Sequence, residues 1–385
     1  MQKKLLALAV AGALAPAAAM AQSTVEIYGR ANMGVDNWQA KGAADSAQNM
    51  KGRFRVFDSA SRLGFRVNES LGGGMRAFAV IESGVNIDTG SQQGQAGPSG
   101  TNGSSGFWAS RTSYLGVGGG WGDVRFGRQD IFYGGGIITQ AGSNYINTAV
   151  DSVWTHSLRV VQPASRQSNT LSYNSPTIGG FNASLYWAPN AAGEGASFTG
   201  GSQKQDAVWA ATARYTGGPL RAQFDYAVDK NVGNVDGSDN TGWKIGVGWA
   251  YAPDSQVSGF FGRLENKVAG GTDNDPKQNI TVLNWEHMLG QWQLIAQYMF
   301  TGKVKGAGAA VEDNSKTKGY TLAAKYFLSK RTGVYFSFNQ YTNESNAFID
   351  FGTGGCLSSA AGCHLSAAQA GADPRIIALG VMHNF

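Results

Sequence analysis

Alternation with a period of two runs through Trp243-Lys244-Ile245-Gly246-Val247-Gly248-Trp249-Ala250-Tyr251. Large apolar side chains occupy the odd-numbered positions, and lysine, glycine and alanine occupy the even-numbered ones. Successive side chains of a β-strand point to opposite faces, so this pattern predicts a strand with one apolar face and one small or polar face. Segments that begin at Phe181, Leu220 and Trp292 alternate in the same way.

The connections between such segments come in two lengths, and short and long ones follow each other strictly. Short connections have the composition of tight turns, whereas long ones are polar and rich in glycine. The pattern predicts 16 strands with about 23 residues per strand and link, which suits a membrane strand of about 9–11 residues. Short connections are expected at 68–74, 118–122, 176–180, 216–219, 252–255, 288–291 and 328–332, and long ones at 39–52, 89–106, 129–168, 190–205, 229–240, 269–275, 303–315 and 344–374.

A membrane explains why such strands would close on themselves. In lipid every backbone polar group must be paired, so the sheet can have no edge. We therefore predict an all-β fold: a 16-stranded antiparallel transmembrane β-barrel with short periplasmic turns and long extracellular loops. Apolar side chains would face lipid, polar ones a water-filled lumen, and aromatic ones the two interfaces. The last segment, 376–385, would pair with the first, at about 24–36. A soluble β-sandwich has similar alternation, but the strict order of short and long connections argues against it.

The composition excludes several other classes of protein. Glycine makes up 55 of 385 residues, charged residues 15% and aromatic residues 11%. A disordered chain would have few aromatic residues and a large net charge, and collagen would have glycine at every third position. A helical membrane protein would need several apolar runs of about 20 residues, whereas the long apolar run here is residues 5–21.

That first segment resembles a secretion signal. Lys3 and Lys4 precede the apolar run, and Ala19-Met20-Ala21 forms a small-x-small cleavage pattern. We predict removal of residues 1–21, which leaves residues 22–385 as a single barrel domain. A buried or membrane helix is the alternative, which the short length disfavours. Without Lys3 and Lys4 the net charge falls from +5 to +3, and nothing indicates a nucleic-acid partner.

Two cysteines, Cys356 and Cys363, lie in one stretch rich in glycine, serine and alanine. Export to an oxidising compartment favours a disulfide between them. A metal site with His364 is the alternative, but two cysteines and one histidine fall short of a complete structural site. We expect no metal and no cofactor.

Several motifs together resemble the general porins of β-proteobacteria, and the resemblance runs along the whole mature chain. Each motif alone is weak evidence for the family, but the order and spacing of the motifs together are specific to it. The motifs are Ser61-Arg62-Leu63-Gly64-Phe65-Arg66, Ile81-Glu82-Ser83-Gly84, Gly122-Asp123-Val124-Arg125-Phe126-Gly127-Arg128-Gln129, Tyr173-Asn174-Ser175-Pro176, Leu328-Ser329-Lys330-Arg331-Thr332 and His383-Asn384-Phe385.

The resemblance implies a homotrimer in the outer membrane, in contact with its lipid and lipopolysaccharide, that passes small hydrophilic solutes by passive diffusion. It also implies an inward-folded third loop at about residues 129–168 that narrows the lumen. Terminal Phe385 matches the aromatic residue that the family presents to the barrel assembly machinery. No reaction and no catalytic residue are implied.

The resemblance further implies a basic constriction. By motif, Arg62, Arg111 and Arg166 match the arginine cluster of anion-selective relatives, and Arg128 lies nearby. Alternation places Arg66 on the same lumen-facing side as Arg62. We expect a weak preference for anions, because guanidinium groups stay charged at physiological pH. The alternative for each arginine is a charge at the rim or a structural salt bridge.

Acidic residues in the constriction loop are few. Many relatives carry an acidic Pro-Glu-Phe-Gly-like segment in the third loop, whereas residues 129–168 contain only Asp130 and Asp151 as carboxylates. Other charged residues are expected on the lumen wall. They are the cations Arg30, Lys244 and Lys325 and the carboxylates Glu26, Asp123 and Asp225, which would neutralise part of the arginine cluster.

Three other functions remain to be weighed. An enzyme is disfavoured, because the chain has four histidines and lacks both Gly-x-Ser-x-Gly and His-Glu-x-x-His. His156 with Asp151, Ser152 and Ser157 is a cluster of common polar residues in a loop. A surface adhesin or receptor would bind its partner through loops such as 344–374. A substrate-specific porin would be revealed by a solute that competes with ions for the channel and lowers its conductance.

Overall fold

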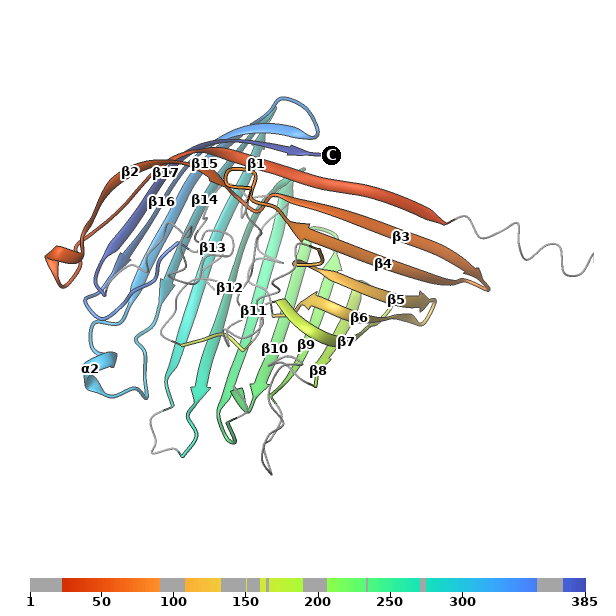
Figure 1. The fold of residues 1–385 in the computed structure, drawn as a ribbon, viewed down its shortest axis with the longest axis horizontal. Helices are drawn as coiled ribbons and strands as arrows, with labels where there is room; N and C mark the ends of the chain where they lie inside the picture. The colour runs from red at the N-terminus through yellow and green to blue at the C-terminus, as the bar shows by residue number, and fades with distance from the viewer. Residues whose placement is uncertain are drawn as a thin grey trace, which may run out of the picture.

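The computed structural model describes residues 23–90, 108–132, 150, 160–163, 166–189, 206–232, 235–270, 275–351 and 370–385. Figure 1 shows antiparallel strands wrapped into a barrel. One sheet contains all the strand segments, and it closes where β1 pairs with β17 over Arg30–Lys41 and Asp373–Asn384. Within the described residues, no helix has both the length and the apolar character needed to cross a membrane.

The elements follow one another along the chain as antiparallel neighbours. They are β1 (Thr24–Lys41), η1 (Ser46–Gln48), β2 (Met50–Asp58), β3 (Arg62–Gly72), β4 (Met75–Gly84), β5 (Ser113–Gly119), β6 (Gly122–Asp130), β7 (Arg166–Asn174), β8 (Phe181–Ala188), β9 (Ala207–Gly217), β10 (Leu220–Lys230), β11 (Asp239–Ala252), β12 (Ser255–Lys267), β13 (Lys277–Leu289), β14 (Trp292–Thr301), α2 (Ala309–Glu312), β15 (Thr317–Phe327), β16 (Thr332–Asn343) and β17 (Asp373–Asn384).

The seventeen segments form sixteen positions around the wall, as predicted. Both β2 and β3 pair with β1: β2 with Met33–Ala40 and β3 with Thr24–Arg30. They are two halves of one strand, interrupted at residues 59–61, where Ala60 has a φ of 60°. The fold is therefore a closed 16-stranded antiparallel barrel.

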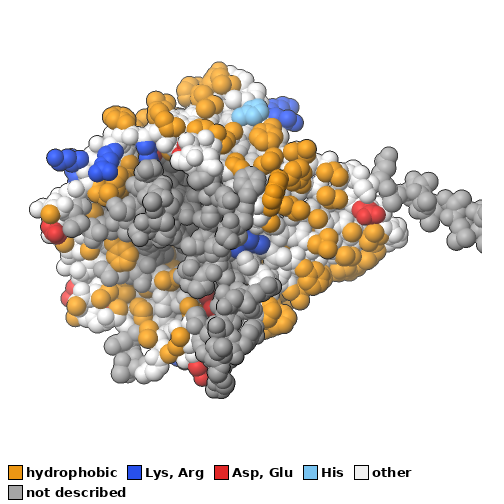
Figure 2. Space-filling view, in the orientation of Figure 1, with side chains coloured by type: hydrophobic (Ala, Val, Ile, Leu, Met, Phe, Trp, Pro, Cys, Tyr) orange, Lys and Arg blue, Asp and Glu red, His pale blue; other side chains and the backbone are white. Residues whose placement is uncertain are grey.

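The two faces of the wall follow the predicted alternation. On β11, Ile245, Val247 and Trp249 are 48%, 48% and 49% exposed, whereas Lys244 on the opposite face is 4% exposed. Figure 2 shows hydrophobic side chains over much of the visible outer surface. Exposed apolar side chains would promote aggregation of a soluble protein. On a transmembrane barrel they form the surface that contacts lipid.

Strand ends differ from the predicted connections in several places. The predicted turn 68–74 is mostly strand, because β3 continues to Gly72 and the turn itself is Gly73 and Gly74, both with positive φ. The predicted loop 39–52 is shorter, since β1 runs to Lys41 and β2 begins at Met50. Polar residues at these positions face water in the loop or in the lumen, so composition alone does not mark where a barrel strand ends.

The third loop folds into the barrel, as expected. Its described residues reach strands on the far side: Lys244 Nζ on β11 donates to the Phe132 carbonyl (3.4 Å) and lies 4.7 Å from the centre of the Phe132 ring. The Val161 amide donates to Asn266 Oδ1 on β12 (2.8 Å), and the Val150 amide donates to Thr321 Oγ1 on β15 (3.0 Å). These contacts cross the lumen and narrow it.

The lumen wall is less polar than the alternation alone indicates. Where the third loop packs against it, apolar side chains line the inside and form one buried cluster with the loop. The loop contributes Ile131, Phe132, Val150 and Val160, and the wall contributes Phe260, Leu264, Ile280, Val282, Ile295 and Met299. Part of the inner face is thus covered by the third loop.

Candidate functional site

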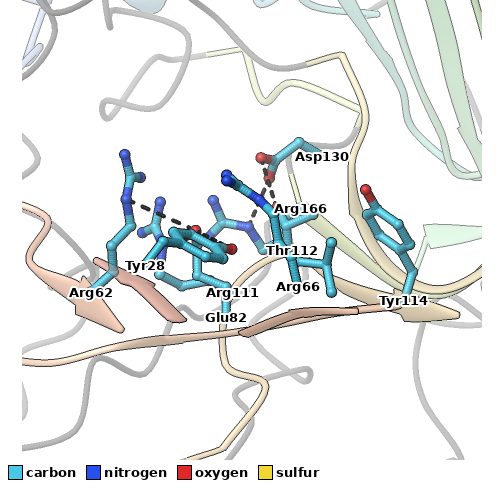
Figure 3. Close-up of a pocket in the computed structure, with 10 residues that line it drawn as sticks. Tyr28, Arg62, Arg66, Glu82, Arg111, Thr112, Tyr114, Asp130 and Arg166 are labelled. Carbon is cyan, nitrogen blue, oxygen red and sulfur yellow. Dashed lines mark hydrogen bonds and ion pairs between the residues drawn. The ribbon is translucent and has the colours of Figure 1, made fainter. Parts of the chain in front are cut away.

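A cavity of about 260 Å³ lies on the inner wall at β1, β3, β4, β5, β6 and β7. Four arginines line it, and two carboxylates lie among them (Figure 3). The lining residues are Tyr28, Arg62, Arg66, Val80, Glu82, Arg111, Thr112, Tyr114, Asp130 and Arg166. The structure therefore brings together Arg62, Arg66, Arg111, Arg166 and Asp130 of the predicted site.

Glu82 on β4 is at the centre of this arrangement. Arg111 Nε donates to Glu82 Oε1 at 2.6 Å, and Tyr28 Oη donates to Glu82 Oε2 at 3.1 Å. Arg62 Nε lies 3.9 Å from Glu82 Oε2. One carboxylate thus holds two guanidinium groups and a phenol from three separate parts of the wall, and charge-assisted hydrogen bonds of this kind fix side-chain direction.

Gly64 makes room for this contact. Tyr28 on β1, Gly64 on β3 and Glu82 on β4 lie in one row across the sheet. A β-carbon on Gly64 would overlap the Tyr28 ring. Because glycine presents no side chain, the ring lies across β3 and its hydroxyl reaches the carboxylate on the next strand.

A second carboxylate, Asp130, holds the other side of the cavity. Arg166 Nε donates to Asp130 Oδ1 at 2.7 Å, and Thr112 Oγ1 donates to Oδ2 at 3.0 Å. Asp130 and Arg166 are register partners at the ends of β6 and β7, where the third loop leaves and rejoins the wall. The pair therefore closes the base of that loop with opposite charges.

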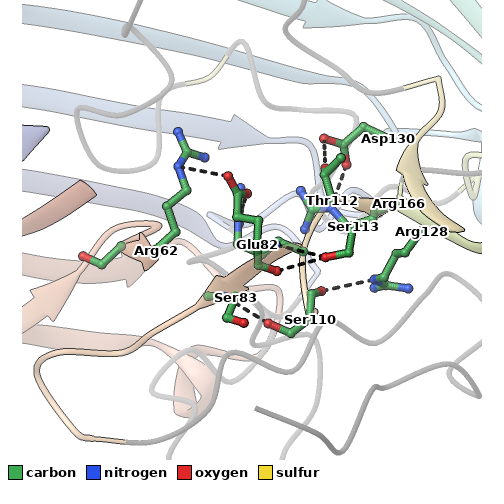
Figure 4. Close-up of polar contacts among 12 residues, drawn as sticks. Arg62, Glu82, Ser83, Ser110, Thr112, Ser113, Arg128, Asp130 and Arg166 are labelled. Atoms are coloured by element: carbon green, nitrogen blue, oxygen red, sulfur yellow. Dashed lines mark hydrogen bonds and ion pairs between the residues drawn. The ribbon is translucent and has the colours of Figure 1, made fainter. Parts of the chain in front are cut away.

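Hydrogen bonds to Ser83, Ser110 and Ser113, all labelled in Figure 4, hold the segment that carries Arg111. Ser110 Oγ accepts from the Gly84 amide (3.0 Å), Ser83 Oγ accepts from the Ala109 amide (3.1 Å), and Ser113 Oγ accepts from the Glu82 amide (3.0 Å). The Arg111 amide itself donates to the Glu82 carbonyl at 2.9 Å. These hydrogen bonds connect the segment before β5 to the end of β4, and they direct Arg111 to Glu82.

Arg66 is the most open arginine of the cluster. Its side chain is 52% exposed, its guanidinium carbon lies 3.8 Å from the centre of the Tyr28 ring, and Nη1 lies 3.5 Å from Glu26 Oε2. An exposed pair of this kind is weak in water. The guanidinium is therefore directed by ring stacking and remains available to a passing ion.

Arg128 does not line the cavity, which corrects the prediction made for it. Arg128 is two residues after Phe126, which is 58% exposed on the outer face, and it is the register partner of Ser113 on β5, so alternation places its side chain on the face opposite the cavity. Its Nε donates to the Ser110 carbonyl (3.1 Å) and its Nη1 to Ser168 Oγ (2.6 Å). Arg128 instead supports the segment that carries Arg111.

The other predicted lumen charges lie on the wall but away from the cavity. Arg30 donates to Asn384 Oδ1 at the seam (2.9 Å), Lys244 lies 3.8 Å from Asp225 on the far wall, and Lys325 is fully buried. Asp123 pairs with Arg125 at 2.6 Å. Of the three carboxylates expected to offset the cluster, Glu26 is the one that contacts a cluster arginine.

Some predicted residues lie outside the part of the chain that the structure describes: Asp151, Cys356 and Cys363, together with the segment 1–21. The disulfide and the second loop carboxylate stay predictions. Among the described residues, no group of three histidine, cysteine, aspartate or glutamate side chains could hold a metal ion.

Comparison with known proteins identifies the family. A family model described as Gram-negative porin matches residues 7–346. The chain belongs to this family. The porin is 27% identical to outer membrane porin protein 32 of Delftia acidovorans over the full length of both chains, and 28% identical to major outer membrane protein P.IB of Neisseria gonorrhoeae, with 88% of this chain and 92% of the relative covered.

Solved structures agree on the fold. An anion-selective porin from Comamonas acidovorans superposes with a TM-score of 0.69 at 22% identity, covering 94% of this chain and all of the other. OmpT of Vibrio cholerae in its trimer form superposes with a TM-score of 0.59 at 13% identity, covering 94% and 99%. The protein is thus an outer-membrane β-barrel that forms a passive-diffusion channel.

Five residues of the porin's cavity were missed from sequence: Tyr28, Val80, Glu82, Thr112 and Tyr114. Glu82 had a usable signal. Its neighbour Ile81 is apolar and 45% exposed, so alternation along β4 places Glu82 on the inner face, where it is the register partner of Gly64. Tyr28 could be placed only after the register between β1 and β3 was known.

Proposed function

We propose that this porin prefers small anions and that the cavity below the third loop sets the preference. Four guanidinium groups and two carboxylates line it, which is a net charge of +2. Guanidinium groups stay charged at physiological pH, and in a narrow pore their field is less screened than at an open surface. This surplus of positive charge is the observation that carries the proposal.

The geometry limits the strength of that preference. Arg111 and Arg166 form close pairs with Glu82 and Asp130, so each of these cations is offset locally. Arg62 lies farther from its carboxylate, and Arg66 is half exposed. The surplus is concentrated on these two side chains, and the expected preference is weak to moderate. The anion selectivity named for the Comamonas protein is in accord with it.

The test is the reversal potential across planar bilayers in a KCl gradient. Arg62→Gln combined with Arg111→Gln brings the lining charge from +2 to 0, so we expect the anion preference to disappear while conductance persists. Lys330→Gln with Arg331→Gln removes the same charge from the exposed turn before β16 and should leave the preference intact. A wild-type channel that prefers cations would contradict the proposal.

We also propose the assembly route that the family implies: export with removal of residues 1–21, recognition of Phe385, and a homotrimer. Phe385 supports closure, because its amide donates to the Gly29 carbonyl (3.1 Å) and its carbonyl accepts from the Gly29 amide (3.0 Å). The trimer form of the Vibrio protein is a precedent for the oligomer. Gel mobility of unheated against heated protein tests the trimer, and a monomer band in the unheated sample would contradict it.

A further inference from the structure

The interruption between β2 and β3 contains one extra residue. Arg30 on β1 is the ladder partner of Arg62, and Met33 is the ladder partner of Asp58. Between these two pairs β1 advances by three residues, whereas the side formed by β2 and β3 advances by four. An insertion of this kind is a β-bulge, which bends the strand and re-aims the side chains beyond it.

The bulge exchanges the two faces of the chain. Before it, Phe57 is buried on the inner side and Val56 is 59% exposed on the outer side. After it, Arg62 and Arg66 line the cavity. Residues 57 and 62 are an odd number of positions apart, so an uninterrupted strand would place them on opposite faces. The extra residue therefore allows Phe57 and both arginines to face the lumen.

Asn32 on β1 holds the bulge from the opposite strand. It is fully buried and lies between the two ladder segments. Its amide donates to Ser61 Oγ (2.9 Å), and its Nδ2 donates to the Ser59 carbonyl (3.0 Å). Its carbonyl accepts from the Ser59 amide (2.9 Å). One residue thus holds both ends of the bulge.

Tyr335 on β16 orients the Asn32 side chain. Tyr335 Oη donates to Asn32 Oδ1 at 2.9 Å, which leaves Nδ2 directed to the bulge. A β-carbon on Gly380 would overlap the Tyr335 ring, so this glycine on β17 lets the ring reach across the seam to β1. The hydrogen bonds therefore connect three strands to the bulge.

Ser61 passes this constraint to Arg62, the next residue. The Ser61 amide donates to Asp58 Oδ1 (3.0 Å), and its carbonyl accepts from the Val85 amide (3.1 Å). Arg62 Nε lies 3.9 Å from its partner carboxylate on Glu82, which is beyond hydrogen-bond distance (Figure 4). The direction of the guanidinium therefore depends strongly on the backbone that Ser61 fixes.

We propose that Asn32 is a positioning residue of the pore, which acts through the bulge on Arg62 and so sets part of the ion preference. The inference rests on the anion preference proposed above. Without the Asn32 amide group the bulge loosens, and the Arg62 guanidinium moves back from the lumen. A retreat from about 5 Å to about 8 Å from a passing ion lowers the permeability ratio of chloride to potassium about 2.5-fold at 0.1 M salt.

The test is a double-mutant cycle read by reversal potential in a KCl gradient across planar bilayers. Asn32→Ala should lower the permeability ratio of chloride to potassium about 2.5-fold, and Arg62→Gln, which removes the charge, about fivefold. The double variant Asn32→Ala/Arg62→Gln should match Arg62→Gln alone, because Asn32 acts through Arg62. A merely structural role of Asn32 would add its effect to that of Arg62→Gln.

Two further substitutions test the hydrogen bonds separately. Ser61→Thr keeps the hydroxyl and should keep the wild-type preference, whereas Ser61→Ala should lower it as Asn32→Ala does. Tyr335→Phe removes one hydroxyl and should lower the preference in the same direction. It gives the same test if Asn32→Ala does not fold, and folding is checked by the gel mobility of unheated against heated protein.

Asn284→Ala on β13 is the matched control, because it removes a buried amide group from the inner wall outside the cavity. It should leave the preference intact. A normal response to Arg62→Gln with none to Asn32→Ala, or an equal loss in Asn284→Ala, would overturn this inference alone. A wild-type channel without anion preference would refute the proposed function and this inference with it.

Discussion

Replacing Glu82 with glutamine should make the channel more anion-selective. The substitution preserves shape and raises the net charge of the lining from +2 to +3. A unit charge about 5 Å from a passing ion contributes about 0.8 kcal/mol in water and about 0.5 kcal/mol after screening at 0.1 M salt. Chloride gains this amount and potassium loses it, so the permeability ratio should rise about fivefold.

The reversal potential in a KCl gradient measures the change. The effect should shrink to below about twofold at 1 M salt, where the Debye length is about 3 Å. Asp254→Asn is the control, because it removes the same charge from the exposed turn between β11 and β12. If Glu82→Gln leaves the potential unchanged or shifts it toward cations, this cavity is not where the channel selects ions.

Two further predictions concern what holds the site together. Gly64→Ala places a methyl group against the Tyr28 ring and should destabilise the barrel by about 1–3 kcal/mol, as overpacking does; urea unfolding followed by tryptophan fluorescence measures this, and equal midpoints would refute it. Phe132→Ala removes the ring that packs on Lys244, so the third loop should loosen and single-channel conductance should rise; Phe181→Ala, on the lipid face, should leave conductance unchanged.

The alternation of apolar and polar side chains was sufficient to predict most of the fold. In β8, β10, β11 and β14 the apolar positions that alternate in sequence all lie on the outer face. The prediction succeeded because the faces of a strand depend only on sequence neighbours, and because an exposed apolar face is stable only in lipid. The strand ends were less accurate, since polar residues such as Asn68 and Ser70 are as suitable in a lumen as in a turn.

The site was predicted in outline. The motif resemblance placed Arg62, Arg111 and Arg166, and alternation placed Arg66; all four line one cavity. Arg128 was placed only by its nearness to the motif arginines; it lies two residues after the exposed Phe126, so alternation alone would have put it on the face opposite the cavity. Its contacts with Ser110, in the segment before β5, and Ser168, on β7, join parts of the chain that no sequence pattern connects.

The sequence by itself determined the class of protein, the order of short and long connections, and the face that most strand residues take. These properties are local, because each depends on spacing along a single strand or link. Tertiary structure alone decided which distant residues meet: Glu82 with Tyr28 and Arg111, and Asn266 with Val161 of the third loop. Such contacts require a closed barrel with a defined register between strands, and that register is set by the whole wall at once.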